Sequence, residues 1–159
     1  MGMRKRIVGA HDTPLRAEDG GWFDLEHIAT VEVTSEDAGF PIESAFESKD
    51  GGGWRASRPG EQQIRIIFDE PVSLRRIELR FDEANCERTH EFTLRSWSAS
   101  GGPATEIIRQ QWNFSPAGST TEIEQYWVDL DAVSVLELVI VPDLQRREAV
   151  ATLSSWRLR

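Results

Sequence analysis

The chain has 159 residues and a mass of 18.0 kDa, which fits one domain large enough to bury a core without a disulfide or metal staple. Its formal net charge of −9 argues against a sequence-independent grip on nucleic acid, because that grip needs a basic face. No stretch approaches the ~18 consecutive apolar residues of a membrane span, so neither nucleic acid nor a membrane is an expected partner.

The N-terminal part is predicted to be an arm that packs on the main domain. Arg6-Ile7-Val8 is typical of a first strand, and Asp19-Gly20-Gly21 is typical of a turn. The segment from Trp22 to Ala29 contains one predicted helical turn, and Trp22 is expected to anchor the N-terminal segment. We therefore expect an arm over residues 1–27 and a single domain over residues 28–159.

Alternating hydrophobicity predicts about eight strands and very little helix in that domain. The segment from Pro41 to Ser48 is predicted as one short helix, because proline suits the first helical position. The last strand is predicted to bury Leu153 on one face and to place Trp156 and Leu158 on the other. The predicted strands cover residues 30–34, 62–68, 74–81, 88–97, 106–112, 121–130, 133–141 and 151–159, with turns at 69–71 and 101–103.

Short strands separated by turn signals are typical of an antiparallel β-sandwich or barrel, so the predicted fold class is all-β. The sequence contains no long internal repeat and no low-complexity linker, and we expect no further domain boundary.

The compartment is predicted from the single cysteine and the first ten residues. Cys86 cannot form an internal disulfide or a thiolate metal cluster by itself. Residues 1–10 contain only Ile7-Val8 as an apolar pair, whereas a secretory signal needs an apolar core of about 7–15 residues. Both features lead us to expect a cytoplasmic protein.

Between residues 28 and 159 several short motifs follow one another in a recognisable order. They are Val33-Thr34-Ser35-Glu36, Ala45-Phe46, Trp54, Ile64 to Pro71, Leu74 to Leu79, Leu136 to Val141 and Ala151 to Leu158. This order resembles the discoidin or coagulation-factor C-type domains of the galactose-binding-like superfamily. The resemblance implies a jelly-roll β-sandwich of about eight strands with its ligand at the loops of one end. This chain differs from many secreted members of the superfamily in lacking the paired cysteines that cross-link them.

Two further resemblances bear on function. Trp54-Arg55-Ala56 followed by Gly60 to Ile64 is similar to the N-terminal domain of the single-strand-break repair scaffold protein, which implies contacts with protein and damaged DNA. Gly51 to Ala56, Glu87 to Phe92 and Gln110 to Pro116 resemble small bacterial stand-alone proteins labelled carbohydrate-binding. Two function classes follow: a non-catalytic module for a carbohydrate or similar small polar ligand, and a cytoplasmic protein-interaction module.

Two aromatic segments are the predicted ligand site. Trp54 could stack on a sugar, Arg55 could donate to hydroxyls or a carboxylate, and the preceding glycines would let a ligand approach the backbone. The alternative is that Trp54 closes the bottom of the sandwich. Trp112-Asn113 borders a loop, and its alternative is a hairpin tip folded onto its own sheet. Arg88 completes the predicted ligand-binding set.

The other tryptophans are assigned to structure. Trp97, Trp127 and Trp156 lie in strand patterns and are expected to pack on sheet faces. Trp54 and Trp112 border loops, and these two are therefore the tryptophans predicted to bind.

No metal or cofactor is expected. Asp82 to Arg88 is an acidic loop that could hold Ca²⁺, and Phe46 to Gly51 is the other place for a structural Ca²⁺. Neither loop has the spacing of a calcium-binding loop, so a solvated acidic loop is the favoured interpretation.

No enzyme is expected either. His90 falls on an inward face and is predicted to be a hydrogen-bonded structural residue. Among enzymes, a glycoside hydrolase is the alternative class. It would need two carboxylates about 5–10 Å apart in a cleft, whereas the strand-borne acids Glu78 and Glu122 are expected to face solvent.

Overall fold

The structure is a computed structural model that describes residues 3, 17–18, 21–47 and 52–159. The predicted strand at residues 6–8 and most of the predicted arm lie outside these residues, as do Asp19-Gly20 and residues 48–51. Within the described part of the arm, β1 (Ala17–Glu18) pairs with β2 (Trp22–Phe23), and α1 (Leu25–Ile28) follows. The described helices are all too short to cross a membrane.

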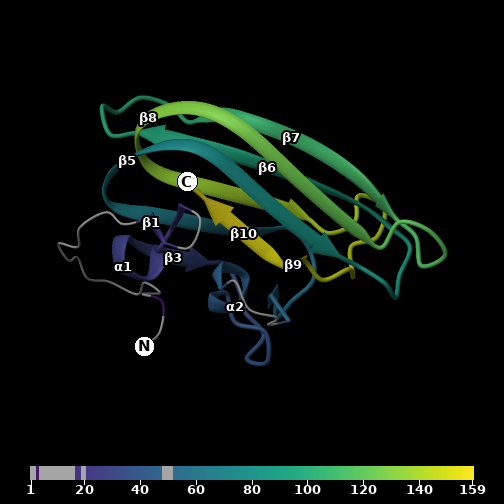
Figure 1. Ribbon diagram of the computed structural model, residues 1–159. Helices are drawn as coiled ribbons and strands as arrows, with labels where there is room; N and C mark the ends of the chain where they lie inside the picture. Colours follow the sequence, from purple (N-terminus) through teal and green to yellow (C-terminus); the bar gives the residue numbers. More distant parts are fainter. Residues whose placement is uncertain (1–2, 4–16, 19–20, 48–51) are drawn as a thin grey trace.

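Antiparallel strands make up most of the described chain (Figure 1). The main strands pair in the order β10-β5-β8-β6-β7, with β3 on the other side of one part of β5. They are β3 (Ala29–Val33), β5 (Gln62–Asp82), β6 (Arg88–Ser98), β7 (Thr105–Phe114), β8 (Thr121–Val141) and β10 (Ser155–Leu158). β4 (Trp54–Arg55) pairs with β9 (Thr152–Leu153), and α2 (Glu43–Phe46) lies within the predicted helix. The all-β prediction is therefore confirmed.

The two longest strands each bend and serve both layers of the sandwich. β5 and β8 pair with each other along their length, with register shifts between Ile67 and Arg76. The first half of β5, with β3, the second half of β8, β6 and β7, forms what we call the large layer. The second half of β5, with the first half of β8 and β10, forms the small layer. Figure 1 shows both long strands arching from one layer to the other.

The predicted turn at residues 69–71 is wrong, because β5 runs through it as an irregular strand. Pro71 lies where the pairing shifts register, and its missing N–H therefore removes no regular ladder bond. Ala132 has a positive φ of 53° at the corresponding bend of β8.

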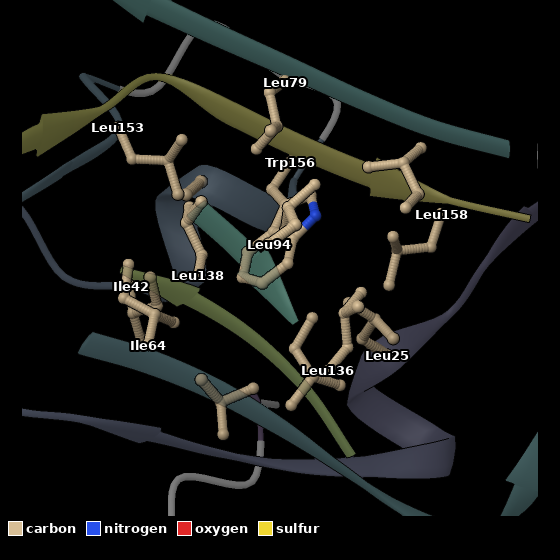
Figure 2. Packing of buried hydrophobic residues seen from close by; sticks show 14 of the residues in the cluster. Leu25, Ile42, Ile64, Leu79, Leu94, Leu136, Leu138, Leu153, Trp156 and Leu158 are labelled. Carbon is tan, nitrogen blue, oxygen red and sulfur yellow. The ribbon is translucent and has the colours of Figure 1, made fainter. Parts of the chain in front are cut away.

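The core lies between the two layers. Every second residue of β5 from Gln62 to Phe68 is buried, as the period-2 pattern predicts. Figure 2 shows Leu79 and Trp156 of the small layer among Ile64, Leu94 and Leu138 of the large layer. Burying such side chains contributes about 1.5–3 kcal/mol each.

Two predictions about the outer strands are wrong. Leu153, Trp156 and Leu158 are all buried at 1% exposure or less, because the strand is interrupted at Ser154 and its facing pattern restarts. Trp127 does not pack on a sheet face, since it is 71% exposed. Its ring contacts the guanidinium of Arg76, whose Cζ lies 4.8 Å from the ring centroid.

Candidate ligand-binding site at the loop end of the sandwich

One end of the sandwich gathers the loops that follow β5, β7 and β8. Arg88 at the start of β6 pairs with Phe114 at the end of β7, and Asp82 pairs with Thr121. The Glu83 backbone N–H donates to the Thr120 carbonyl at 2.9 Å. We call this region, residues 82–88, 114–121 and 142–151 with the adjoining Arg55, which pairs with Thr152, the loop end. It lies at the right of Figure 1.

Arg88 braces the loop end from within. Its side chain is 11% exposed, its Nη1 donates to the Val150 carbonyl at 2.9 Å, and its Nη2 bonds the Glu83 carboxylate. Its Nε is buried without a hydrogen-bond partner among the described residues. Burial lowers the pKa of the Arg88 guanidinium, the Asp143 carboxylate opposes this, and the nearby Arg55 cation lowers it further. Arg88 therefore has a structural role and one unmatched donor.

Arg55 presents a charged group at the surface near Arg88, because it pairs with Thr152 and Arg88 bonds the Val150 carbonyl two residues earlier. Its backbone is held on both sides, because its N–H donates to the Phe40 carbonyl at 3.1 Å and its carbonyl accepts from the Asp37 N–H at 2.8 Å. The exposed guanidinium lies over the Phe40 ring, with Cζ 4.9 Å from the centroid. It makes no hydrogen bond with the rest of the described chain, so its donors are available to a ligand.

Trp54 closes the sandwich and does not present a ring to a ligand. It is 1% exposed, and its Nε1 donates to the Ser35 carbonyl at 3.1 Å. The preceding glycine also has a structural role. Gly53 has φ +72°, and a Cβ there would lie 2.4 Å from the Leu153 carbonyl oxygen. The stacking role predicted for Trp54 is thus incompatible with its burial, and the alternative role at the base of the sandwich fits.

Trp112 and Asn113 are neighbours that point to opposite faces of β7. Trp112 pairs with His90 and packs half-buried against the core, where its Nε1 is buried and has no described partner. Asn113 is exposed, and its Oδ1 accepts from the Thr89 hydroxyl at 2.7 Å. These two residues therefore cannot contact one small ligand from the same face.

A group of buried polar side chains that the sequence did not indicate starts at His90, the strand partner of Trp112. His90 Nε2 and Glu122 Oε1 are 2.5 Å apart, with side chains 4% and 0% exposed. On the same face of β8, the Tyr126 hydroxyl donates to Glu124 Oε2 at 2.8 Å. The structural role predicted for His90 is confirmed. The prediction that Glu122 faces solvent is wrong, and a carboxylate with no exposure cannot reach a substrate.

The alternating pattern of residues 121–130 is compatible with either face of the strand being the buried one. Glu122, Glu124 and Tyr126 alternate with Ile123, Gln125 and Trp127, and each set mixes polar with apolar side chains. A one-residue change of register would exchange the two faces, so the pattern by itself did not identify the buried set.

Burial shapes the acid–base behaviour of this group. It raises the pKa of the Glu124 carboxyl; the Tyr126 hydroxyl bond opposes this rise, and the neighbouring Glu122 reinforces it. Burial and the adjacent Glu124 carboxylate also raise the pKa of the Tyr126 phenol. Glu124 is therefore less acidic in the folded chain than in the unfolded one.

Replacing Glu124 with glutamine should raise the free energy of unfolding, relative to the parent, more at neutral pH than in acid. Between the unfolded and the raised folded pKa the native state binds more protons, so the free energy of unfolding falls as pH rises through that interval. In Glu124→Gln this fall in the free energy of unfolding is absent, because glutamine does not titrate, and its side-chain oxygen can still accept from the Tyr126 hydroxyl. Urea unfolding at about pH 4 and pH 7 should show the variant gaining relative to the parent as pH rises. Exposed Glu70→Gln is the control, and an equal difference at both pH values would contradict the prediction.

In the acidic loop from Asp82 to Arg88, the Glu83 carboxylate is hydrogen-bonded within the loop itself. Glu83 Oε2 accepts from the N–H groups of Asn85 and Cys86, and Oε1 bonds Arg88. In the described ranges, the group whose ligand atoms lie within 4.8 Å of one another is Asp24, Glu26 and His27 instead. Most of the other predicted calcium loop, Phe46 to Gly51, lies outside those ranges.

The comparisons with known proteins agree with this architecture. No protein-family model and no curated protein matches the sequence. The family 32 carbohydrate-binding module of Clostridium perfringens NanJ, solved with galactose, matches with a TM-score of 0.60 and 12% identity, over 82% of this chain and 92% of that one. The chain has the fold of a family 32 carbohydrate-binding module. This confirms the predicted galactose-binding-like sandwich.

Two other solved structures share the fold. The family 32 module of AlyQ, in complex with 4,5-unsaturated mannuronic acid, has a TM-score of 0.60 and 13% identity over 83% of this chain and 95% of that one. Reduced XRCC1, bound to the DNA pol beta catalytic domain, has a TM-score of 0.58 and 12% identity over 92% of this chain and 97% of that one. The sugar-binding matches are binding modules, some of them parts of glycoside hydrolases.

Proposed function

We propose that the protein is a non-catalytic module that binds a carboxylate-bearing saccharide at the loop end. The observation that carries this proposal is the exposed Arg55 guanidinium, stacked on Phe40 near Arg88. Stacking and the two backbone bonds hold Arg55 in place, so little of its freedom is lost when a ligand binds.

Charge explains why an acidic sugar suits this place. The Arg55 cation lowers the pKa of the neighbouring Arg88, and a ligand carboxylate bound at Arg55 would offset this like-charge repulsion. The planar guanidinium of Arg55 matches a carboxylate with two parallel hydrogen bonds. Among the structural relatives, AlyQ is described with a mannuronic acid derivative, which supports the same ligand class here.

Isothermal titration with a galacturonic acid dimer tests the proposal, with the neutral disaccharide lactose for comparison. We expect the acidic dimer to bind and Arg55→Ala to weaken its affinity at least about tenfold, because hydrogen bonds to charged groups contribute about 1.5–3 kcal/mol. Arg109→Ala, an exposed arginine on β7, is the matched control and should bind normally. Absence of acidic binding at millimolar concentration, or equal affinity in Arg55→Ala, would refute the proposal.

A protein-interaction module is the second candidate function. Among the residues that the structure describes, positions 121–130 of β8 pair only with β5, which leaves the other backbone edge of this stretch without a described partner strand. Ile123 and Trp127 on it are 54% and 71% exposed. The similarity to XRCC1 in complex with a protein partner also favours this class. Saturable saccharide binding that Arg55→Ala abolishes would favour the first candidate over it.

A further inference from the structure

A second polar site lies on the outer face of the large layer. A hollow of about 410 Å³ is lined there by Glu32, Val33, Thr34, Gln63 and Arg65, from β3 and β5 and the residue after β3. This volume lies in the range of small-molecule sites. The hollow does not include Arg55 or Arg88, so it is separate from the loop-end residues of the proposed function.

Arg65 is held in position before any ligand arrives. Its Nε donates to Glu137 Oε2 at 2.6 Å, and the Glu137 side chain is 0% exposed. Its Cζ lies 5.2 Å from the Trp97 ring centroid, so the ring steadies the guanidinium plane. Arg95 binds the other Glu137 oxygen, with Nε at 3.0 Å. A buried carboxylate and an aromatic ring together fix the orientation of Arg65.

Several donors around the hollow remain available. The terminal Nη groups of Arg65 and the side-chain amide of Gln63 make no hydrogen bond with any described residue. The Thr34 hydroxyl donates to Gln62 Oε1 at 2.7 Å and accepts from the Gln63 N–H at 3.0 Å. Arg65 and Gln63 thus offer donors, and the side-chain carbonyl of Gln63 and the hydroxyl oxygen of Thr34 offer acceptors.

The charged groups around the hollow leave no excess of positive charge, which argues for an uncharged ligand. The strand pairing places Glu32, Arg65, Glu137, Arg95 and Glu106 in one row across the large layer. The row alternates three carboxylates with two arginines, so no excess positive charge remains for a ligand carboxylate. Hydroxyl groups both donate and accept, and they match the mixed set that lines the hollow.

We infer that this hollow is a second saccharide site that takes an uncharged sugar, with Arg65 and Gln63 as its main hydrogen-bonding residues. The inference goes beyond the proposed function, because it needs neither Arg55 nor an acidic ligand. Two sites of different charge preference on one chain would allow it to engage a saccharide bearing both kinds of unit, with a gain from effective concentration.

Lactose titrated into ¹⁵N-labelled protein tests this inference, with the galacturonic acid dimer as the second probe. We expect lactose to shift the backbone amide signals of Thr34, Gln63 and Arg65, and to do so equally in Arg55→Ala. Gln63→Ala should weaken lactose binding about fivefold, as the loss of a neutral hydrogen bond implies, and leave the acidic dimer's affinity unchanged. Arg65→Lys keeps the charge but loses the planar fork, and it should weaken lactose binding as well.

The outcomes separate this site from the loop end. Loss of the lactose shifts in Arg55→Ala would show one extended site and would overturn the inference. So would lactose shifts confined to residues 82–88 and 114–121, or no shifts at tens of millimolar lactose. Failure of the acidic dimer to bind would overturn only the proposed function. Arg109→Ala is the control for both probes, and its lactose affinity should equal that of the parent.

Discussion

Trp54→Ala is expected to lower the free energy of unfolding by about 3–5 kcal/mol, the usual cost of truncating a large buried aromatic residue. Trp54 is 1% exposed, and alanine would leave a cavity at the base of the sandwich. It would also leave the Ser35 carbonyl without the indole donor that it now accepts from at 3.1 Å. Urea unfolding followed by circular dichroism measures the loss.

Trp127→Ala is the matched control for this prediction. It removes the same side chain from a position that is 71% exposed, where the described contact is with Arg76. We expect a change of about 0.5–1 kcal/mol or less, the size of an exposed cation–π contact. Equal losses in the two variants would contradict the assignment of Trp54 to the core. Unchanged saccharide affinity in the fraction of Trp54→Ala that stays folded would confirm that Trp54 is not a ligand contact.

Glu137→Ala is the second substitution expected to have a large effect, with a loss of about 2–4 kcal/mol. Removing one member of a buried ionic group leaves the remaining charges without compensation, at about 3–5 kcal/mol for fully buried pairs. The expected loss is smaller here because Arg65 and Arg95 are 44% and 39% exposed, so water can solvate them in part.

Two controls make the Glu137 measurement specific. Glu106→Ala removes a carboxylate that is 50% exposed and bonded to Arg109, and a loss below about 1 kcal/mol is expected for it. Glu137→Gln keeps an acceptor for one arginine and should fall between the parent and Glu137→Ala. A Glu137→Ala protein as stable as the Glu106→Ala protein would show that the Arg65–Glu137–Arg95 group does not stabilise the large layer.

Local pattern predicted the strands well where one face is plainly apolar. Ile77, Leu79 and Phe81 alternate with polar residues and are all buried at 1% exposure or less. The pattern wrongly predicted a turn at Asp69-Glu70-Pro71, because these residues lie within the irregular part of β5. Turn composition shows where regular pairing is weak. Whether the chain reverses or bends there depends on partner strands that lie far away in the sequence.

The predicted site was only partly found, for a related reason. Arg55 and Arg88 do lie near each other at the loop end, and Trp54, Trp112 and Asn113 do not join them as one surface. Aromatic residues beside glycines are typical both of binding loops and of close-packed corners. A Cβ at position 53 would lie 2.4 Å from the Leu153 carbonyl oxygen, so the glycine is needed for close packing of the chain and not for access of a ligand.

The sequence by itself determined the fold class, because period-2 hydrophobicity is a local property of each strand and the order of the motifs fits one family of sandwiches. Only the tertiary structure decided which carboxylates are buried and which tryptophan is exposed. Glu122 and Glu137 are buried by His90, Arg65 and Arg95, whose strands β6 and β5 meet β8 across long separations in the chain. Burial of a charge depends on the partner that compensates it, and that partner is brought into contact only by the pairing of the strands.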